Sequence, residues 1–170
     1  MTDSSPIHEA EDHADPVAYQ QHDITEVTRA HSTMADYHYA DQFVLATNAA
    51  AAGTPEEWAH AALVEVAGRG GQLIWRGLLG LRLARRSAPE QVAGWPIVER
   101  GDTWITLAAP SWMLTGNLVV EVGAEGVSLV TFIRYERPIG KWIWTRASRV
   151  HRRLAPGLLA DAQRVLRTHP

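Results

Sequence analysis

The fold is decided by residues 127–167, VSLVTFIRYERPIGKWIWTRASRVHRRLAPGLLADAQRVLR, where the apolar pattern changes its period. From Val127 to Glu136 apolar and polar residues alternate, which is typical of a strand with one buried face. From Lys141 to Arg167 the apolar residues recur every three or four positions, which predicts one long amphipathic helix. A helix with one apolar stripe needs an apolar surface to cover. The strands that precede it are the nearest such surface.

The predicted helix separates apolar from basic residues. Its apolar stripe consists of Ile143, Ala147, Val150, Leu154, Leu158 and Val165. The opposite side carries Arg146, Arg149, Arg153, Arg164 and Arg167. We therefore expect the six apolar residues to face the sheet.

Period-two alternation upstream of this helix predicts a meander of strands. The segments with this pattern are Trp95–Arg100, Thr103–Ala109, Gly116–Val122 and Val127–Glu136. Short turns join consecutive segments, which is typical of an antiparallel sheet rather than of βαβ units. An earlier apolar run, residues 43–47, predicts the first strand.

Two helices are predicted between this first strand and the meander. Thr54, Pro55 and Glu57 form a helix start with a capping box, and glycines at 68–71 mark its end. Residues 72–86 predict a second helix that is apolar on nearly all sides. The expected fold class is α+β: an antiparallel β-meander of about five or more strands gripping a long C-terminal helix, with two helices inserted after the first strand.

Length and charge indicate one domain with an acidic lead. The chain has 170 residues and a formal net charge of -3, and nine acidic side chains but a single basic one fall within residues 1–41. We expect residues 1–36 to be a flexible, solvated lead and residues 37–168 to form the folded domain. The open alternative is that the lead lies against the basic body of the protein and competes with an anionic partner.

Several function classes are excluded or disfavoured. The absence of cysteine excludes a disulfide scaffold, a thiolate nucleophile and any site with cysteine ligands. No apolar run approaches the roughly 20 residues of a transmembrane helix, and the polar start is unlike a signal peptide, so we expect a cytoplasmic protein. Glu57 and His60 match E-x-x-H, but no second copy exists, so we expect no metal and no cofactor. A negative net charge without a helix-turn-helix pattern disfavours a nucleic-acid partner. A homodimer is left open.

The order of the predicted elements resembles that of the START-like (SRPBCC) helix-grip superfamily, which includes polyketide cyclases, pollen allergens and lipid-transfer domains. The resemblance spans residues 37–168. It is carried by Tyr39–Phe43, Thr54–Ala59, Pro138–Trp142 and Val150–Leu154, which are similar to an actinobacterial branch of that superfamily. Five predicted strands are fewer than the six or seven usual there. The resemblance implies a cavity between sheet and terminal helix, but no shared catalytic signature that could be transferred to this chain.

The aromatic load of the chain, which includes seven tryptophans, supplies candidates for lining such a cavity. The candidate ligand-binding residues are Trp95, Trp104, Trp112, Asn117, Phe132, Arg134 and Trp144. Ordinary core packing is the alternative for each aromatic ring, because large aromatic side chains dominate core energetics in any domain.

Three residues are candidate acid/base groups. Glu121 would share a pocket wall with Arg134 if both faced inward, whereas the alternative is an ion pair on the solvent face of the sheet. The opposite register, which contains Leu118 and Val120, is more apolar and competes for the core. Tyr135, on the same strand as Arg134, is the second candidate. His151, at the edge of the helix stripe, is the third, and its alternative is a boundary histidine with a solvated tip.

These observations predict a protein that binds a hydrophobic small molecule, lipid- or polyketide-like, between its sheet and its terminal helix. The alternative is a cyclase or dehydratase of secondary metabolism that uses a pocket carboxylate, tyrosine or histidine. A third reading is a protein-interaction module that uses the acidic lead.

Overall fold

The computed structural model describes residues 16–47 and 53–168 and has the expected α+β class. Its strands are β1 (Ala18–Gln21), β2 (Tyr39–Ala46), β3 (Gln91–Val92), β4 (Trp95–Arg100), β5 (Trp104–Pro110), β6 (Leu114–Gly123) and β7 (Gly126–Tyr135). Its helices are α1 (Glu26–Ala30), α2 (Pro55–His60), α3 (Gly68–Gln72) and α4 (Pro138–Thr168), with π-helical segments η2 (Ala61–Val66) and η3 (Leu73–Leu78).

The strands form one antiparallel sheet of seven, in the order β1-β2-β7-β6-β5-β4-β3. The meander β4 to β7 follows the sequence prediction closely. The two additional strands, β1 and β3, are the edges of the sheet and have four and two residues. Such short strands carry too little alternation to be recognised in the sequence.

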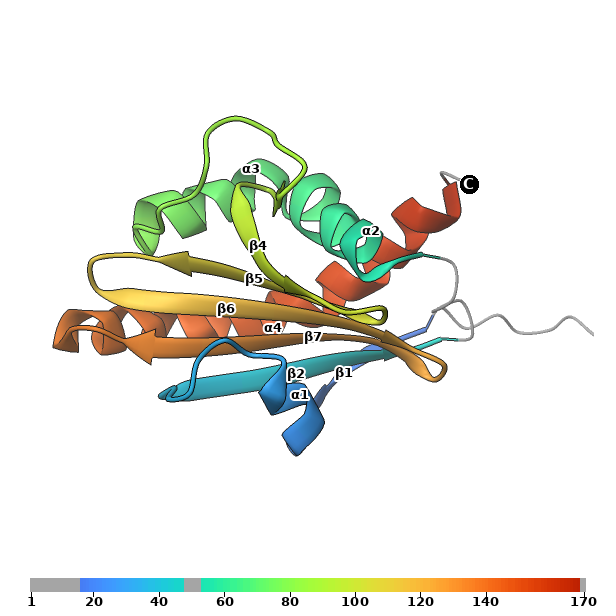
Figure 1. Cartoon of the computed structure of the whole chain (residues 1–170), viewed down its shortest axis with the longest axis horizontal. Coiled ribbons are helices and arrows are strands. Elements are labelled where there is room, and N and C mark those ends of the chain that lie inside the picture. The colour runs from blue at the N-terminus through green and yellow to red at the C-terminus, as the bar shows by residue number, and fades with distance from the viewer. Residues whose placement is uncertain (1–15, 48–52, 169–170) are drawn as a thin grey trace, which may run out of the picture.

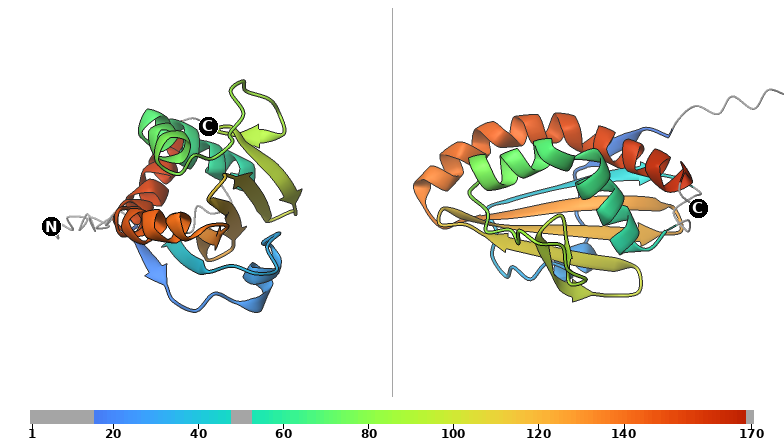
Figure 2. Two further views of the ribbon diagram at one scale, coloured as in Figure 1. Left: turned by 90° about the vertical axis from the view of Figure 1, so that its left-hand side faces the viewer. Right: turned by 90° about the horizontal axis from the view of Figure 1, so that it is seen from above.

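Helix α4 lies across one face of the sheet, and the helical segments between β2 and β3 lie beside it on that face (Figures 1 and 2). The capping box predicted at Thr54 is present, with Thr54 and Glu57 exchanging side-chain and backbone hydrogen bonds. Gly68, with φ +46°, interrupts the helical path where a stop was predicted, but α3 begins at that residue. None of the helices in the described residues is long and apolar enough to cross a membrane.

The predicted second helix ends earlier than expected, at Leu78. Beyond it Leu79, Leu81 and Leu83 are buried alternately, so this segment packs with the period of a strand rather than of a helix. Arg76 fixes it by donating hydrogen bonds to the carbonyl groups of Leu83 and Ala84. The prediction that the helix continues to residue 86 was wrong because the backbone of this segment bonds to other elements: the Arg82 N–H donates to the Pro110 carbonyl and the Ala84 N–H to the Gly94 carbonyl.

The N-terminal region also differs from the sequence expectation. Residues 18–21 pair with the edge of β2, and residues 26–30 form α1, although both fall within the lead expected to be flexible. Backbone pairing at a sheet edge and the N-cap at Thr25 stabilise these elements without a large apolar content. Residues 1–15 of the predicted lead lie outside the described residues.

The sheet separates two apolar cores. The larger lies between the sheet and the helices and includes Phe43, Leu107 and Leu159. The smaller lies on the outer face, where Met34 is buried against Val119, Val130 and Phe132. Each candidate functional residue on the sheet therefore lies in one of two separate environments, the inner face under the helices or the outer face.

The stripe of α4 that faces the sheet is rotated from the predicted one. Trp144, Ala155 and Leu159 are buried, whereas Val150 and Leu154 are 50% and 58% exposed. The prediction that Val150 and Leu154 are covered was therefore wrong, and both border a cavity described below.

The first turn of α4 packs tightly at Gly140 against the backbone of Met113, the residue before β6. A methyl group there would lie 2.2 Å from the carbonyl oxygen of Met113, whereas one at Gly157 would meet no atom within 4 Å. We expect Gly140→Ala to lower the free energy of unfolding by about 1–3 kcal/mol through overpacking. Gly157→Ala is the matched control and should raise it by up to about 1 kcal/mol through helix propensity. Urea denaturation measures both, and equal effects would contradict this packing.

Candidate functional site

An apolar cavity of about 650 Å³ lies between the sheet and the helices. The sheet contributes Leu118, Leu129 and Ile133, and the helices contribute side chains from η2, α3, η3 and α4. Trp95 and Trp144 line it from opposite sides, one from β4 and one from α4. The cavity has the size and apolar character of small-molecule sites in proteins.

His151 is the histidine in the wall of this cavity, and it contacts a buried carboxylate. Its Nε2 atom lies 3.1 Å from Oδ2 of Asp41, whose side chain is only 1% exposed. The hydroxyl oxygen of Thr131, another cavity-lining residue, lies 3.3 Å from the same Nε2 atom. The tautomer of His151 that carries its proton on Nε2 can donate a hydrogen bond to an ionised Asp41 carboxylate, which only accepts.

The second partner of Asp41 is the hydroxyl group of Tyr39, which donates a hydrogen bond to Oδ2. Burial, together with the neighbouring Asp41 carboxylate, raises the pKa of Tyr39 well above its ordinary value. Tyr39 therefore keeps its proton and remains a donor at physiological pH. Arg152 in turn donates to the Tyr39 oxygen over 3.3 Å.

This arrangement leaves the other ring nitrogen of His151 available. Among the described residues, Nδ1 of His151 has no hydrogen-bond partner. A neutral imidazole with Nε2–H has an unprotonated Nδ1, which is a hydrogen-bond acceptor and a base. The site therefore combines an apolar enclosure with one basic nitrogen, held by a buried acid.

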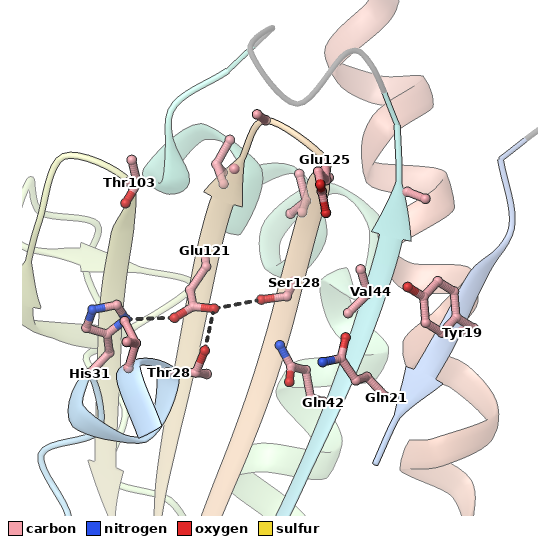
Figure 3. A pocket seen from close by; sticks show the side chains of 17 residues that line it. Tyr19, Gln21, Thr28, His31, Gln42, Val44, Thr103, Glu121, Glu125 and Ser128 are labelled. Carbon is pink, nitrogen blue, oxygen red and sulfur yellow. Dashed lines mark hydrogen bonds and ion pairs between the residues drawn. The ribbon is translucent and has the colours of Figure 1, made fainter. Parts of the chain in front are cut away.

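A second pocket, of about 580 Å³, lies on the outer face of the sheet (Figure 3). At its centre Glu121 accepts hydrogen bonds from His31 Nδ1 at 2.7 Å, and from the hydroxyl groups of Thr28 and Ser128 at 3.1 Å each. The ring of His31 stacks on Trp104, with a centroid distance of 4.1 Å. With three donors the carboxylate is satisfied by the protein itself, and it fixes α1 against β6 and β7.

The structure divides the sequence-predicted site residues between the two faces. Trp95, Trp144 and His151 line the apolar cavity. Glu121 and Trp104 are on the outer face, as are Asn117 and Phe132, which are buried under residues 31–37.

The remaining three predicted residues, like Trp104, Asn117 and Phe132, line neither pocket. Arg134 pairs with Glu136 at 2.8 Å rather than with Glu121. The Tyr135 ring stacks on His38, and burial raises its pKa. Trp112 is exposed, with the Arg137 guanidinium 5.9 Å from its ring centre.

Asp41, Thr131 and Tyr39 were missed by the sequence analysis as candidate site residues. The available signal was strand parity: Asp41 has the same parity as the buried Phe43 and Leu45, so it faces the helices. Thr131 likewise falls between the inward-facing Leu129 and Ile133. A carboxylate on an apolar strand face needs a partner, and that requirement could have directed attention to it.

Comparisons of the chain with protein-family models, with curated proteins and with solved structures find no match. The described residues contain no group of three or more histidine, aspartate or glutamate side chains arranged to hold a metal ion.

The outer-face network generates a stability prediction. We expect Glu121→Gln to lower the free energy of unfolding by about 1–3 kcal/mol, because His31 and two hydroxyl groups lose their charged acceptor. Glu125→Gln is the control, since Glu125 lines the same pocket and is exposed; it should change stability by less than about 0.5 kcal/mol. Urea denaturation compares the two, and equal losses would contradict the role assigned to Glu121.

The contact between Tyr39 and Asp41 generates a titration prediction. We expect Asp41→Asn to lower the pKa of Tyr39, because it removes the carboxylate charge that disfavours the phenolate. Burial remains in the variant, so the pKa should stay above the ordinary value for tyrosine. NMR with labelled tyrosine rings measures this pKa, and an unchanged value would contradict the contact.

Proposed function

We propose that the protein binds one apolar small molecule, lipid- or polyketide-like, in the cavity between its sheet and α4. The observation that carries this proposal is the apolar cavity of about 650 Å³, lined from both layers of the fold. Well-packed interiors contain few voids larger than a water molecule, so a space of this size beside an intact core needs an explanation. An apolar ligand would be stabilised there by about 25 cal/mol for each Å² of apolar surface removed from water.

The lining also indicates what the ligand should carry. Thr131 and His151 are polar groups in a largely apolar wall that also includes Arg153 and Asp161, and the Thr131 hydroxyl oxygen lies 3.3 Å from Nε2 of His151. A few polar groups in an apolar pocket usually fix a ligand's orientation. A mainly apolar ligand with a single hydroxyl or carbonyl group near His151 fits this distribution best.

We further propose that the chain is a member of the START-like superfamily. The support is architectural: a seven-stranded antiparallel sheet with a long C-terminal helix across one face is consistent with a helix-grip fold. The seven strands of the sheet also match the six or seven that are usual in this superfamily, whereas the five strands predicted from the sequence were too few. The cytoplasmic location and the homodimer stay predictions.

Filling the cavity tests the binding proposal. We expect Ala147→Leu to weaken binding of the anionic aromatic dye 1-anilinonaphthalene-8-sulfonate about tenfold, because the larger side chain occupies the space of the dye's rings. Thr145→Leu is the matched control, two residues away on the exposed side of α4. Fluorescence titration gives both dissociation constants. Equal affinities for the two variants would contradict binding in this cavity.

A second candidate function is acid–base catalysis on the bound molecule, of the cyclase or dehydratase type. The observation that favours it is the contact between His151 and the buried Asp41 carboxylate at the cavity wall. In such a step Nδ1 of His151 would take a proton from a carbon or hydroxyl group of the ligand. Asp41 would stabilise the resulting imidazolium and hold the ring in place.

Proton abstraction can be tested with 5-nitrobenzisoxazole, an apolar probe. A base removes its C3 proton, the N–O bond breaks, and a coloured cyanophenolate forms. We expect His151→Gln to reduce the protein-catalysed rate by a factor of about 100 or more, while His60→Gln, an exposed control, leaves it unchanged. Equal rates for both variants would contradict a catalytic role for His151.

A further inference from the structure

The charges of the protein are strongly segregated along the chain. Residues 66–89 contain five arginines and no acidic residue, and residues 137–160 contain five arginines, one lysine and no acidic residue. Together these two stretches hold 11 of the 16 basic side chains, although the whole chain has a net charge of -3. Their positive charge is therefore a local property of one part of the molecule.

The fold brings the two stretches together around the opening of the apolar cavity. The first forms α3 and η3 and the segment beyond them, and the second forms most of α4; both cover the same face of the sheet (Figure 2). Ile74 and Leu78 line the cavity from one stretch, and Val150 and Leu154 line it from the other. The basic stretches thus border the route between the cavity and solvent.

Large apolar side chains are exposed on the same two stretches. Leu73 is 74% exposed and Trp142 is 55% exposed, although a folded core would normally bury such side chains. We call the exposed apolar set the mouth face: Leu73, Leu78, Ile139, Trp142, Val150 and Leu154. Along α4, arginines lie between the residues of the mouth face. The Arg146 guanidinium lies 3.7 Å from the centre of the Trp142 ring.

We propose that the mouth face docks on an anionic lipid bilayer, from which the cavity takes, or to which it delivers, its apolar ligand. This inference rests on the proposed ligand-binding function. Basic side chains beside exposed leucine and tryptophan are the composition of surfaces that lie in a membrane interface. The arginines attract anionic headgroups, and the apolar side chains enter the region between headgroups and acyl chains. Docking in this orientation lets an apolar ligand enter the cavity without crossing bulk water.

The exposed apolar side chains favour a bilayer over a nucleic acid. Both are polyanions and both would attract the arginines. A nucleic acid would leave Leu73, Leu78 and Ile139 in water, because aliphatic side chains gain little from phosphates. A bilayer removes them from water.

Vesicle sedimentation tests the electrostatic part of the proposal. The full chain is mixed with vesicles of phosphatidylcholine containing 30% phosphatidylglycerol, and with vesicles of phosphatidylcholine alone. We expect the double variant Arg146→Gln and Arg149→Gln to bind the anionic vesicles about tenfold more weakly than the unmodified chain. Neither residue lines the cavity. The control, Arg29→Gln with Arg134→Gln, removes the same charge from elements away from the mouth face and should bind like the unmodified chain.

A second double variant tests the contribution of the exposed apolar side chains to vesicle binding. We expect Ile139→Ser with Trp142→Ser to weaken vesicle binding about fivefold or more without changing the net charge, since less apolar surface enters the bilayer. The proposal is overturned if the chain binds neutral and anionic vesicles equally, if the arginine pair and its control behave alike, or if a DNA duplex competes fully with the vesicles.

Dye binding without vesicles separates this proposal from the function on which it rests. If the arginine and Ile139/Trp142 variants keep the affinity of the unmodified chain for 1-anilinonaphthalene-8-sulfonate but lose the vesicles, the docking surface is supported. If the unmodified chain binds the dye in its cavity but no vesicle, docking alone is overturned. If the unmodified chain binds neither the dye nor the vesicles, both the docking proposal and the ligand-binding function on which it rests are overturned.

Discussion

The contact between Asp41 on β2 and His151 on α4 is the interaction on which the rest of the arrangement depends. Asp41 is a carboxylate in an apolar core, and removing one partner of a buried charge typically costs about 3–5 kcal/mol. That requirement fixes the rotation of α4 over the sheet, because His151 must face inward. The same rotation carries Val150, one residue earlier, and Leu154, three residues later, to the edge of the helix, where they border the cavity. The contact thus agrees with the burial of Trp144, Ala155 and Leu159, which turn the same side of the helix toward the sheet.

The two faces of the sheet differ in what they carry. On the inner face the helices cover an apolar space and hold a basic nitrogen at its wall. On the outer face α1 and the following residues are attached by short, mutually satisfied polar contacts: Glu121 with His31, and Asn117 with Thr33. These contacts bury polar groups whose partners are all supplied by the protein. The unsatisfied base and the largely apolar lining are therefore confined to one side, and our functional proposals concern that side alone.

Much of the fold could be predicted from the sequence because its pattern is local. Period-two alternation located β4 at its observed bounds, and the capping box at Thr54 marked the start of α2. The N-terminal elements could not be found this way, since β1 has only four residues and is held by pairing with β2 and by burial of Ala18 in the main core. The candidate site was predicted only in part: Trp95, Trp144 and His151 line the cavity, whereas Asp41 was noted as one acid among nine near the N-terminus and as part of Tyr39–Phe43, but not as a site residue. Its role depends on contact with a residue 110 positions away, which no local pattern reveals.

The most direct test of ligand binding between sheet and α4 is a methyl NMR titration with 1-anilinonaphthalene-8-sulfonate. The inner and outer faces of the sheet carry separate methyl groups, so the position of the bound molecule can be read directly. We predict that the methyl signals of Leu118, Leu129 and Ile133 shift on binding, while those of Val119 and Val130 on the outer face do not. Shifts confined to the outer-face methyl groups, or no shifts at concentrations where the dye fluoresces, would contradict the account.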